Sequence, residues 1–508
     1  MAPAHGGSAT APAHTAPDLP RLSAATAARL PDAVRRPAYD PRAAPIGIVH
    51  LGLGAFHRAH QAIYFDDLLA RRAGAYGVLG ASLRSPGVAA QLVPQDGLYL
   101  QRCLADGDDS LRLVGAVREA CFAAADPAAL VRRMARPEVH AYTLTVTEKG
   151  YCHRPADGTL DLAHPDIAHD LAHPDAPRSA PGLLVAALAL RRAQGAPAPN
   201  ILCCDNLPAN GRVLRGLVLA LAARTDPALA DWIAAHVAFP CTMVDRIVPA
   251  TTEADRAAVA AAVGLRDEGL VKAEPFSQWV VEARFAGAPP PLDTVGATLV
   301  DDVAPWELAK LRMLNGAHSA IAYLGVLAGW PTVADAMRVP ALQRFIERLL
   351  ADEVAPTLPA GRGPDPVAYR RALLARFANG ALQHRTAQIA MDGSQKLPQR
   401  LLGTLRDRLA ARAPFDRLAL AVAAWMRHLE GVDDQGAPVA VDDPLAARLR
   451  AALDGAGAAP EARVAALLAQ REVFPEALAA DPRVRAALSD AFTSLHRHGV
   501  RAVLEVTP

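Results

Sequence analysis

The spacing of apolar and polar residues changes near residue 300. Before that point, short apolar runs alternate with helical stretches, which is typical of a parallel sheet covered by helices. The runs that we predict to be strands are 46–51, 76–83, 98–104, 110–117, 141–146, 200–204, 242–244 and 297–300. From Trp306 onward the apolar period is helical, and the helices that we predict are 310–324, 341–354, 366–377, 399–411, 417–429, 446–454 and 483–496.

This pattern predicts an α/β fold in which a sheet domain, residues 41–300, precedes a mostly α-helical domain, residues 301–508. Residues 1–40 are rich in Ala, Pro and His, and we predict a disordered or extended leader there. Residues 152–180 are rich in Asp, Pro and His, and we predict a surface excursion. The histidines of that excursion are spaced too irregularly to indicate a metal site.

The composition and charge of the chain exclude several classes of partner. The chain has 508 residues, too many for one ordinary core, and a formal net charge of +1. Without a basic stripe, nucleic acid is not an expected partner. No apolar run reaches membrane length and no secretory signal opens the chain, so we expect no membrane span and a cytoplasmic location. The six cysteines include no CxxC pair, which predicts reduced thiols.

The first predicted strand runs directly into Gly52-Leu53-Gly54 and then into a helix that we predict to reach about Leu69. A strand, a GxG turn and a helix start together form a cradle for the phosphates of a dinucleotide. The usual third glycine is missing, because His57 stands in its place. The alternative interpretation is a sharp turn that binds no ligand.

The end of the second predicted strand bears on the choice of cofactor. An acidic residue there would bind the ribose 2′-hydroxyl of NAD. The chain has Ser82, Arg84 and Ser85 instead. Arg84 could favour the 2′-phosphate of NADP, or it could be a solvated loop arginine, so the sequence leaves the preference open.

The stretch from Trp306 to Ser319 carries the most chemistry. Read as an α-helix of about 100° per residue, it places Lys310, Asn315 and His318 within an arc of roughly 140° on the side facing the core. Arg312 and Ser319 point elsewhere, and we predict that they are solvated. A desolvated lysine tends to lose its proton near neutral pH. The alternative is a structural hydrogen-bond network around one buried lysine.

These segments together resemble the mannitol dehydrogenase family, the polyol-specific long-chain dehydrogenases. The motifs that carry the resemblance are Gly52-x-Gly54-x-Phe56-His57-Arg58-Ala59-His60, Thr145 to Tyr151, Cys204-Asp205-Asn206 with Asn210-Gly211, Thr242 to Arg246, and Lys310-x-Arg312-x-Leu314-Asn315-x-x-His318-Ser319. The resemblance implies a Rossmann-type dinucleotide-binding domain before the helical domain, and the missing third glycine is the family's own pattern.

The resemblance also implies metal-independent hydride transfer between NAD, or NADP, and a secondary alcohol. In that family Lys310 matches the general acid/base and His318 a neighbouring histidine. Two amides, Asn206 and Asn315, match the pair that holds the substrate oxygen. The remaining matches are two acidic residues of the site, Asp245 and Glu148, and the cofactor-binding residues Gly52, Gly54, Phe56, Arg58 and, with its open preference, Arg84.

Within the family the chain looks most like the fructuronate reductases, which implies interconversion of D-fructuronate and D-mannonate. The alternative substrates are neutral polyols, as in mannitol 2-dehydrogenase or arabinitol dehydrogenase. A non-catalytic dinucleotide-binding sensor is an alternative of another class. The expected partner is a small sugar acid or polyol, and the protein is expected to be a monomer or small homo-oligomer.

A polar interruption of the helical half, residues 383–400, suggests how a sugar acid would be recognised. We hypothesise that Arg385 and Lys396, with His384, pair with the substrate carboxylate. The alternative role for these cations is a belt of salt bridges that ties the two domains together.

Overall fold

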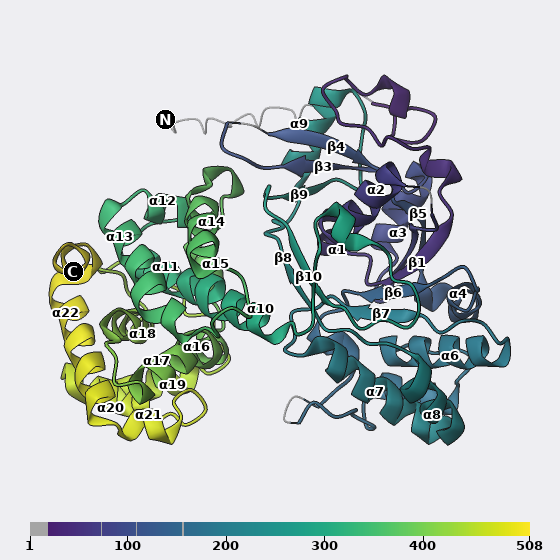
Figure 1. Cartoon of the computed structure of the whole chain (residues 1–508). Coiled ribbons are helices and arrows are strands. Elements are labelled where there is room, and N and C mark those ends of the chain that lie inside the picture. The colour runs from purple at the N-terminus through teal and green to yellow at the C-terminus, as the bar shows by residue number, and fades with distance from the viewer. Residues whose placement is uncertain (1–18, 73, 108, 155–156, 508) are drawn as a thin grey trace, which may run out of the picture.

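The computed structural model describes residues 19–72, 74–107, 109–154 and 157–507. It has two lobes, which Figure 1 shows side by side: the N-terminal lobe carries the sheets, and the C-terminal lobe, green to yellow, is helical. Helix α10 (Ala304–Ala309) lies where the chain crosses between them. This arrangement confirms the predicted α/β fold followed by a helical domain.

The core of the first lobe is a parallel sheet with the strand order β5-β2-β1-β6-β7. Its strands are β1 (Ile46–Leu51), β2 (Gly77–Ser82), β5 (Val117–Phe122), β6 (Ala141–Leu144) and β7 (Asn200–Cys203). Numbered along the chain, the parallel strands have the order 3-2-1-4-5, which is that of a doubly wound dinucleotide-binding sheet without its sixth strand. Since all neighbours are parallel, the carboxyl ends of the five strands meet at one edge.

Helices cover the parallel sheet because its strands are apolar on both faces. Val49 and Leu51 of β1 point into one buried cluster and Ile48 into the other. The helices of the first cluster are α4 (Pro127–Met134), α6 (Ala180–Ala193), α7 (Asn210–Thr225) and α8 (Pro227–His236). The opposite face is covered by α2 (Gln61–Arg71), with α1 (Ala55–Ala59) and α3 (Gly87–Leu92) nearby.

Two smaller sheets complete the lobe. One has the order β11 (Thr298–Val300), β10 (Gln278–Glu282), β8 (Thr242–Asp245), and the other β4 (Ser110–Val114), β3 (Tyr99–Cys103), β9 (Val271–Ala273). The predicted strand 110–117 was wrong at its end: β4 stops at Val114, and β5 begins at Val117 and joins the parallel sheet. The break follows from Gly115, whose N–H donates to Asp66 Oδ1 at 2.9 Å instead of to a strand.

Two predictions about irregular segments need correction. Residues 1–18 lie outside the described part, but the rest of the predicted leader packs on the lobe through Leu22, Leu30 and Val34, which are buried. The predicted excursion 152–180 contains a helix, α5 (Pro165–Ala172), whose Ile167 is fully buried. In both cases a few apolar residues in a polar stretch were enough to fix it to the core.

The helical lobe is built around α11 (Gly316–Leu327), which packs against α15 and α18. The other helices are α12 (Val333–Met337), α13 (Pro340–Arg348), α14 (Pro366–Ala378), α15 (Thr386–Ala390), α16 (Gly393–Leu397), α17 (Gly403–Ala410), α18 (Asp416–His428), α19 (Ala446–Gly455), α20 (Pro460–Leu468), α21 (Glu476–Ala480) and α22 (Pro482–Val506). Three segments that we predicted as α-helix are π-helical: η7 (Lys310–Asn315), η8 (Leu349–Val354) and η11 (Pro398–Leu402).

No helix in the described ranges combines the length and the apolar character needed to cross a membrane. None of the six cysteines, all of which lie in the described ranges, forms a disulfide, as the sequence predicted.

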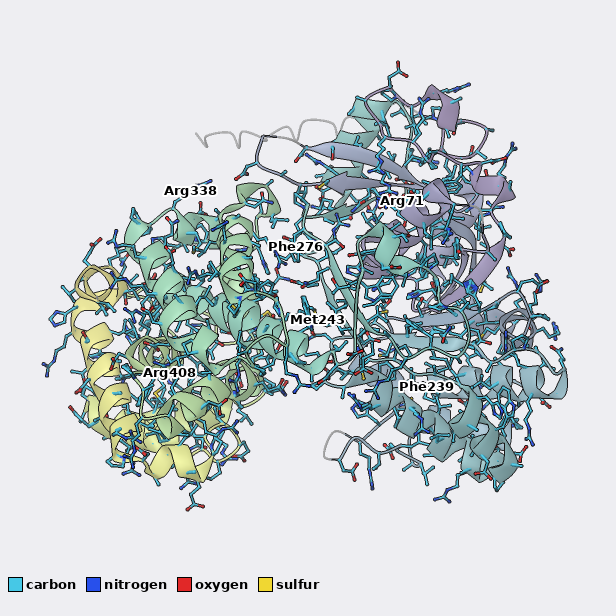
Figure 2. The ribbon with its side chains drawn as sticks, viewed as in Figure 1. Arg71, Phe239, Met243, Phe276, Arg338 and Arg408 are labelled. Carbon is cyan, nitrogen blue, oxygen red and sulfur yellow. The ribbon has the colours of Figure 1, made fainter. Side chains whose placement is uncertain are left out.

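A buried ion-pair network joins the two lobes. Arg376 of α14 donates to Asp245 Oδ2 at the end of β8 and to Glu274 Oε1 after β9, each at 2.7 Å. The guanidinium also lies 4.0 Å from the ring centroid of Phe276, which Figure 2 shows at the junction of the lobes. All three charged side chains are almost fully buried, so the network is compensated only while both lobes are in contact.

We predict that Arg376→Met lowers the free energy of unfolding by about 3 to 5 kcal/mol, because it leaves two buried carboxylates without their cation. Urea unfolding followed by circular dichroism measures the change. The matched control is Arg371→Met, an exposed position on the same helix, which should change stability by less than about 0.5 kcal/mol. Equal effects of the two substitutions would contradict the proposed tie between the lobes.

Candidate active site

The π-helical turn η7 brings Lys310 and Asn315 together. In an α-helix these two residues would lie about 140° apart, but π-helical hydrogen bonds join residues five apart, so both side chains fall on one face. Pro305 occupies the first turn of α10, and α11 continues the helix from Gly316 without a break in direction. The wider turn therefore aims an amine and an amide at the same space.

Lys310 reaches from the helical lobe to the edge of the sheet lobe. Its Nζ donates to Asn206 Oδ1 at 2.9 Å and to the carbonyl oxygen of Val244 at 2.8 Å. Because the amide oxygen of Asn206 faces the amine, its Nδ2 remains available to donate elsewhere. The predicted neighbourhood of Lys310 and Asn206 is thus present, although the two residues come from different lobes.

The electrostatic setting of Lys310 favours its neutral form. Burial lowers its pKa below the ordinary value, the carboxylate of Asp245 opposes this shift, and the cations Arg376 and Arg400 reinforce it. A lysine held in this way can exchange a proton closer to neutral pH than a solvated lysine can.

The loop that carries Asn206 is fixed from three sides. Asp205 accepts from the backbone N–H groups of Val146 and Thr147, each at 2.9 Å. Asn210 Nδ2 donates to the carbonyl oxygens of Asp205 and Thr242, and Glu307 accepts from Ala209 N–H. The loops after β6 and β7, the start of β8 and helix α10 are therefore one connected unit.

A cavity of about 220 Å³ lies between the lobes beside Lys310. Its polar wall is formed by side chains from both lobes: Asp205, Asn206, Glu307, Lys310, Asn315 and Gln399. The apolar wall includes Leu311 and Met243, which Figure 2 labels at the junction of the two lobes. The cavity offers a small polar molecule one amine and three side-chain amides together.

His318 lies deeper in the helical lobe than the cavity wall. Its ring is buried, 4.7 Å from Phe377 and 5.4 Å from His384 between centroids, and its Nε2 has no hydrogen-bond partner among the described residues. Burial holds the pKa of His318 well below its usual value, so the ring is neutral.

The two predicted acids differ in their placement. Asp245 is buried and bound by Arg376, so its charge acts on Lys310 while its oxygens are occupied. Glu148 is exposed on a 3-10 turn, Glu148–Tyr151. Burial raises the pKa of the neighbouring Asp205, and the charge of Glu148 adds to that rise. Glu148 does not line the cavity beside Lys310.

The glycine turn after β1 has the shape of a cofactor cradle. Gly52 has a φ of 99°, and a Cβ there would lie 2.2 Å from the carbonyl oxygen of Thr145, so only glycine fits. A Cβ on Gly54 would meet nothing closer than 3.7 Å, which leaves its face open to a ligand. The predicted single helix after the turn is broken at His60, where α1 ends and α2 begins.

Of the two other residues predicted at this turn, Phe56 is partly exposed and stacks on His60 at 5.0 Å. Arg58 is buried: it donates to the carbonyl oxygens of Gly269 and Gly54 and lies over the Tyr99 ring. Arg58 therefore fixes the turn from beneath, and its role in cofactor binding stays a prediction.

Arg84 lines a second cavity, of about 480 Å³, at the carboxyl ends of β2 and β6. The same cavity is lined by Lys149, Arg178 and Asp166. The ligand atoms of Cys152, His164 and Asp166 lie within 4.8 Å of one another there, a proximity that the irregular spacing did not predict. The Nδ1 of His164 already accepts from Asp166 N–H at the start of α5.

The side chains of the predicted cationic cluster have different surroundings in the structure. Lys396 donates to the Met391 carbonyl oxygen at 2.6 Å and lies 3.6 Å from Asp392 Oδ2. Arg385 is exposed before α15, and His384 is half-buried against His318. Lys396 is therefore partly neutralised within its own turn.

The prediction that Arg312 and Ser319 are solvated is wrong. Both are buried, and Arg312 pairs with Asp407 at 2.6 Å while it donates to the Thr357 carbonyl oxygen at 3.1 Å. A long side chain facing away from the first lobe meets other helices of its own lobe rather than solvent.

Three residues near Lys310 were not predicted as site residues: Glu307, Gln399 and Arg400. Glu307 stands one turn before Lys310 in the sequence, and the other two close the polar interruption that we singled out. These sequence positions could have indicated all three residues. Only the packing of η11 against η7, however, brings Gln399 and Arg400 to this site.

Comparison with known proteins agrees with this geometry. Residues 46–294 match the mannitol dehydrogenase Rossmann domain, and residues 302–496 match the mannitol dehydrogenase C-terminal domain. Among solved structures, the mannitol 2-dehydrogenase of Pseudomonas fluorescens, in a ternary complex with NAD and D-mannitol, is 37% identical with a TM-score of 0.80. The match covers 96% of this chain and 99% of that one.

Two Escherichia coli (strain K12) proteins are each 44% identical to the chain. One, the D-mannonate oxidoreductase, aligns over 92% of this chain and 97% of its own length, and the other, the uncharacterized oxidoreductase YeiQ, over 94% and 97%. With both family models matched in order along almost the whole chain, the protein belongs to the mannitol dehydrogenase family.

Proposed function

We propose that the protein is an NAD-dependent oxidoreductase that interconverts D-fructuronate and D-mannonate without a metal. The observation that carries the proposal is the contact of Lys310 Nζ with Asn206 Oδ1, 2.9 Å apart, at the wall of a cavity between the lobes. The similarity to D-mannonate oxidoreductase supports this substrate pair.

In the oxidation of the alcohol, neutral Lys310 accepts the hydroxyl proton while the C–H bond of the same carbon breaks. A nicotinamide cofactor held at the turn of Gly52 and Gly54 would supply the hydride acceptor for that carbon, which becomes a carbonyl carbon. The free Nδ2 groups of Asn206 and Asn315 donate to the developing alkoxide. In reduction Lys310, as an ammonium, returns the proton to the carbonyl oxygen.

The remaining residues act around this centre. The carboxylate of Asp245 opposes the fall in the pKa of Lys310 that burial causes, and Arg376 keeps that carboxylate in place. His318 is a buried, neutral ring whose Nε2 has no partner among the described residues, and we assign it a supporting role behind Lys310 and Asn315. Glu148, exposed after β6, acts through Asp205 on the Asn206 loop.

NAD fits the edge of the parallel sheet. Gly52 and Gly54 form the phosphate cradle, with Phe56 beside it. No acidic residue follows β2, and Arg84 with Lys149 lines the cavity there, which supports measurable use of NADP as well. The absence of disulfides among the six described cysteines fits a reducing compartment such as the cytoplasm.

An initial-rate panel tests the proposed reaction: NADH or NADPH against fructuronate, tagaturonate, fructose and xylulose. We expect the highest kcat/KM for fructuronate with NADH. A preference for fructose or xylulose would favour the neutral-polyol alternative, and the absence of any NADH oxidation would favour a non-catalytic sensor.

We predict that Lys310→Met lowers kcat by on the order of 10²- to 10⁴-fold, because the proton acceptor is lost. Binding of NADH, measured by fluorescence titration, should be unchanged, since the amine does not hold the cofactor. A loss of less than tenfold would contradict a general acid/base role for Lys310.

We predict that Asn206→Asp moves the pH profile, because it places a carboxylate 2.9 Å from Lys310 Nζ and raises the pKa of that amine. Alcohol oxidation needs the neutral amine, so its kcat/KM should rise only at higher pH, with a shift of about 1 to 3 units. Asn206→Ala, the matched control, should lower the rate without this upward shift. Identical profiles for both variants would argue against contact between the two groups during turnover.

A further inference from the structure

Arg400 is a cation without a carboxylate partner in the part of the chain that the structure describes. It lies in η11, is half-buried, and its Nη1 donates to Ser319 Oγ at 3.3 Å. No described carboxylate oxygen lies within 4.0 Å of its guanidinium. Four of the five donors of this side chain therefore have no protein acceptor among the described residues.

Other buried arginines of the helical lobe have carboxylate partners. Arg312 pairs with Asp407 at 2.6 Å, Arg376 with Asp245 and Glu274, and Arg427 with Glu430 at 2.8 Å. Burying a guanidinium costs free energy that a paired carboxylate recovers only with good geometry. Arg400 departs from this pattern although it is held by a helix turn and is not on a free surface.

The position of Arg400 connects it with the cavity beside Lys310. The π-turn η11 lies directly against η7, since a Cβ on Gly316 would be 2.9 Å from the Arg400 carbonyl oxygen. The preceding residue, Gln399, lines the cavity together with Lys310 and Asn315. Ser319, the partner of Arg400, follows Asn315 by four residues on the same helix.

Positive charge accumulates around this point. Burial lowers the pKa values of Lys310, His318 and Lys396, and the charge of Arg400 lowers them further; burial also lowers the pKa of Arg400 itself. Lys396 has Asp392 nearby, whereas Arg400 has no such neighbour. A bound anion at Arg400 would relieve this repulsion, and a neutral hydroxymethyl group would not.

We propose that Arg400 is the specificity-determining residue that binds the carboxylate of the substrate, at the end of the carbon chain away from the reacting carbon. The inference rests on the proposed function for its substrate and extends it by assigning the acid group to one side chain. The planar guanidinium matches a carboxylate with two parallel N–H donors, and the half-buried position strengthens both hydrogen bonds. Exposed Arg385 and partly neutralised Lys396 then contribute at longer range.

The test uses D-fructuronate and D-fructose. The two have the same carbon chain, but fructuronate ends in a carboxylate where fructose has a hydroxymethyl group. With NADH as reductant, Arg400→Gln should lower kcat/KM for fructuronate by about 10- to 100-fold and change the value for fructose by less than about threefold. Arg400→Lys should fall between wild type and Arg400→Gln, since it keeps the charge and loses the fork. Arg371→Gln, an exposed position of the same lobe, is the control for loss of one surface cation and should change neither value.

Equal losses with the acid and the neutral sugar, or no loss with either, would overturn the assignment. So would a selective loss of fructuronate activity in Arg385→Gln with Arg400→Gln unaffected. Calorimetric titration of D-mannonate into the NAD-saturated protein separates this inference from the proposed reaction. If wild type binds mannonate at least tenfold more tightly than Arg400→Gln does, yet reduces neither sugar, the anion site stands and the assigned reaction fails.

Discussion

The site depends on an amine that is withdrawn from water between two lobes. Lys310 Nζ finds one partner in Asn206 and one in the backbone of β8, and both partners belong to the other lobe. The nearby network of Arg376, Asp245 and Glu274 is buried at the same junction. Separating the lobes would expose the amine and leave three charged groups without their compensation, so the catalytic setting and the contact between lobes are stabilised together.

The two lobes position the side chains of the site in different ways. The sheet lobe supplies loops at the carboxyl ends of parallel strands, and the loop of Asn206 is fixed by Asp205, Asn210 and Glu307. The helical lobe supplies side chains from π-turns, which widen the helix locally. η7 presents Lys310 and Asn315 on one face, and η11 beside it presents Gln399 and Arg400.

Charge in the helical lobe divides into compensated and uncompensated groups. Buried cations that support the fold have carboxylate partners, as Arg312 has Asp407. The cations around the cavity have few carboxylate partners: Asp245 is already bound by Arg376, and Arg400 has only the hydroxyl of Ser319 among the described residues. This asymmetry suits an anionic substrate, because the free energy of placing cations near one another is recovered when an anion binds.

The sequence by itself determined the class of the fold and most elements of the site. Apolar runs with period 2 or no period marked the parallel strands, and glycines at 52 and 54 marked the cradle, because local sterics permit little else there. The tertiary structure decided what local pattern does not encode. It split 110–117 between two sheets, turned three helical stretches into π-turns, buried Arg312 and Arg58 on internal partners, and brought Arg400 beside Lys310. Each of these depends on a partner distant in the chain, and a side chain's exposure and charge are fixed only when that partner packs against it.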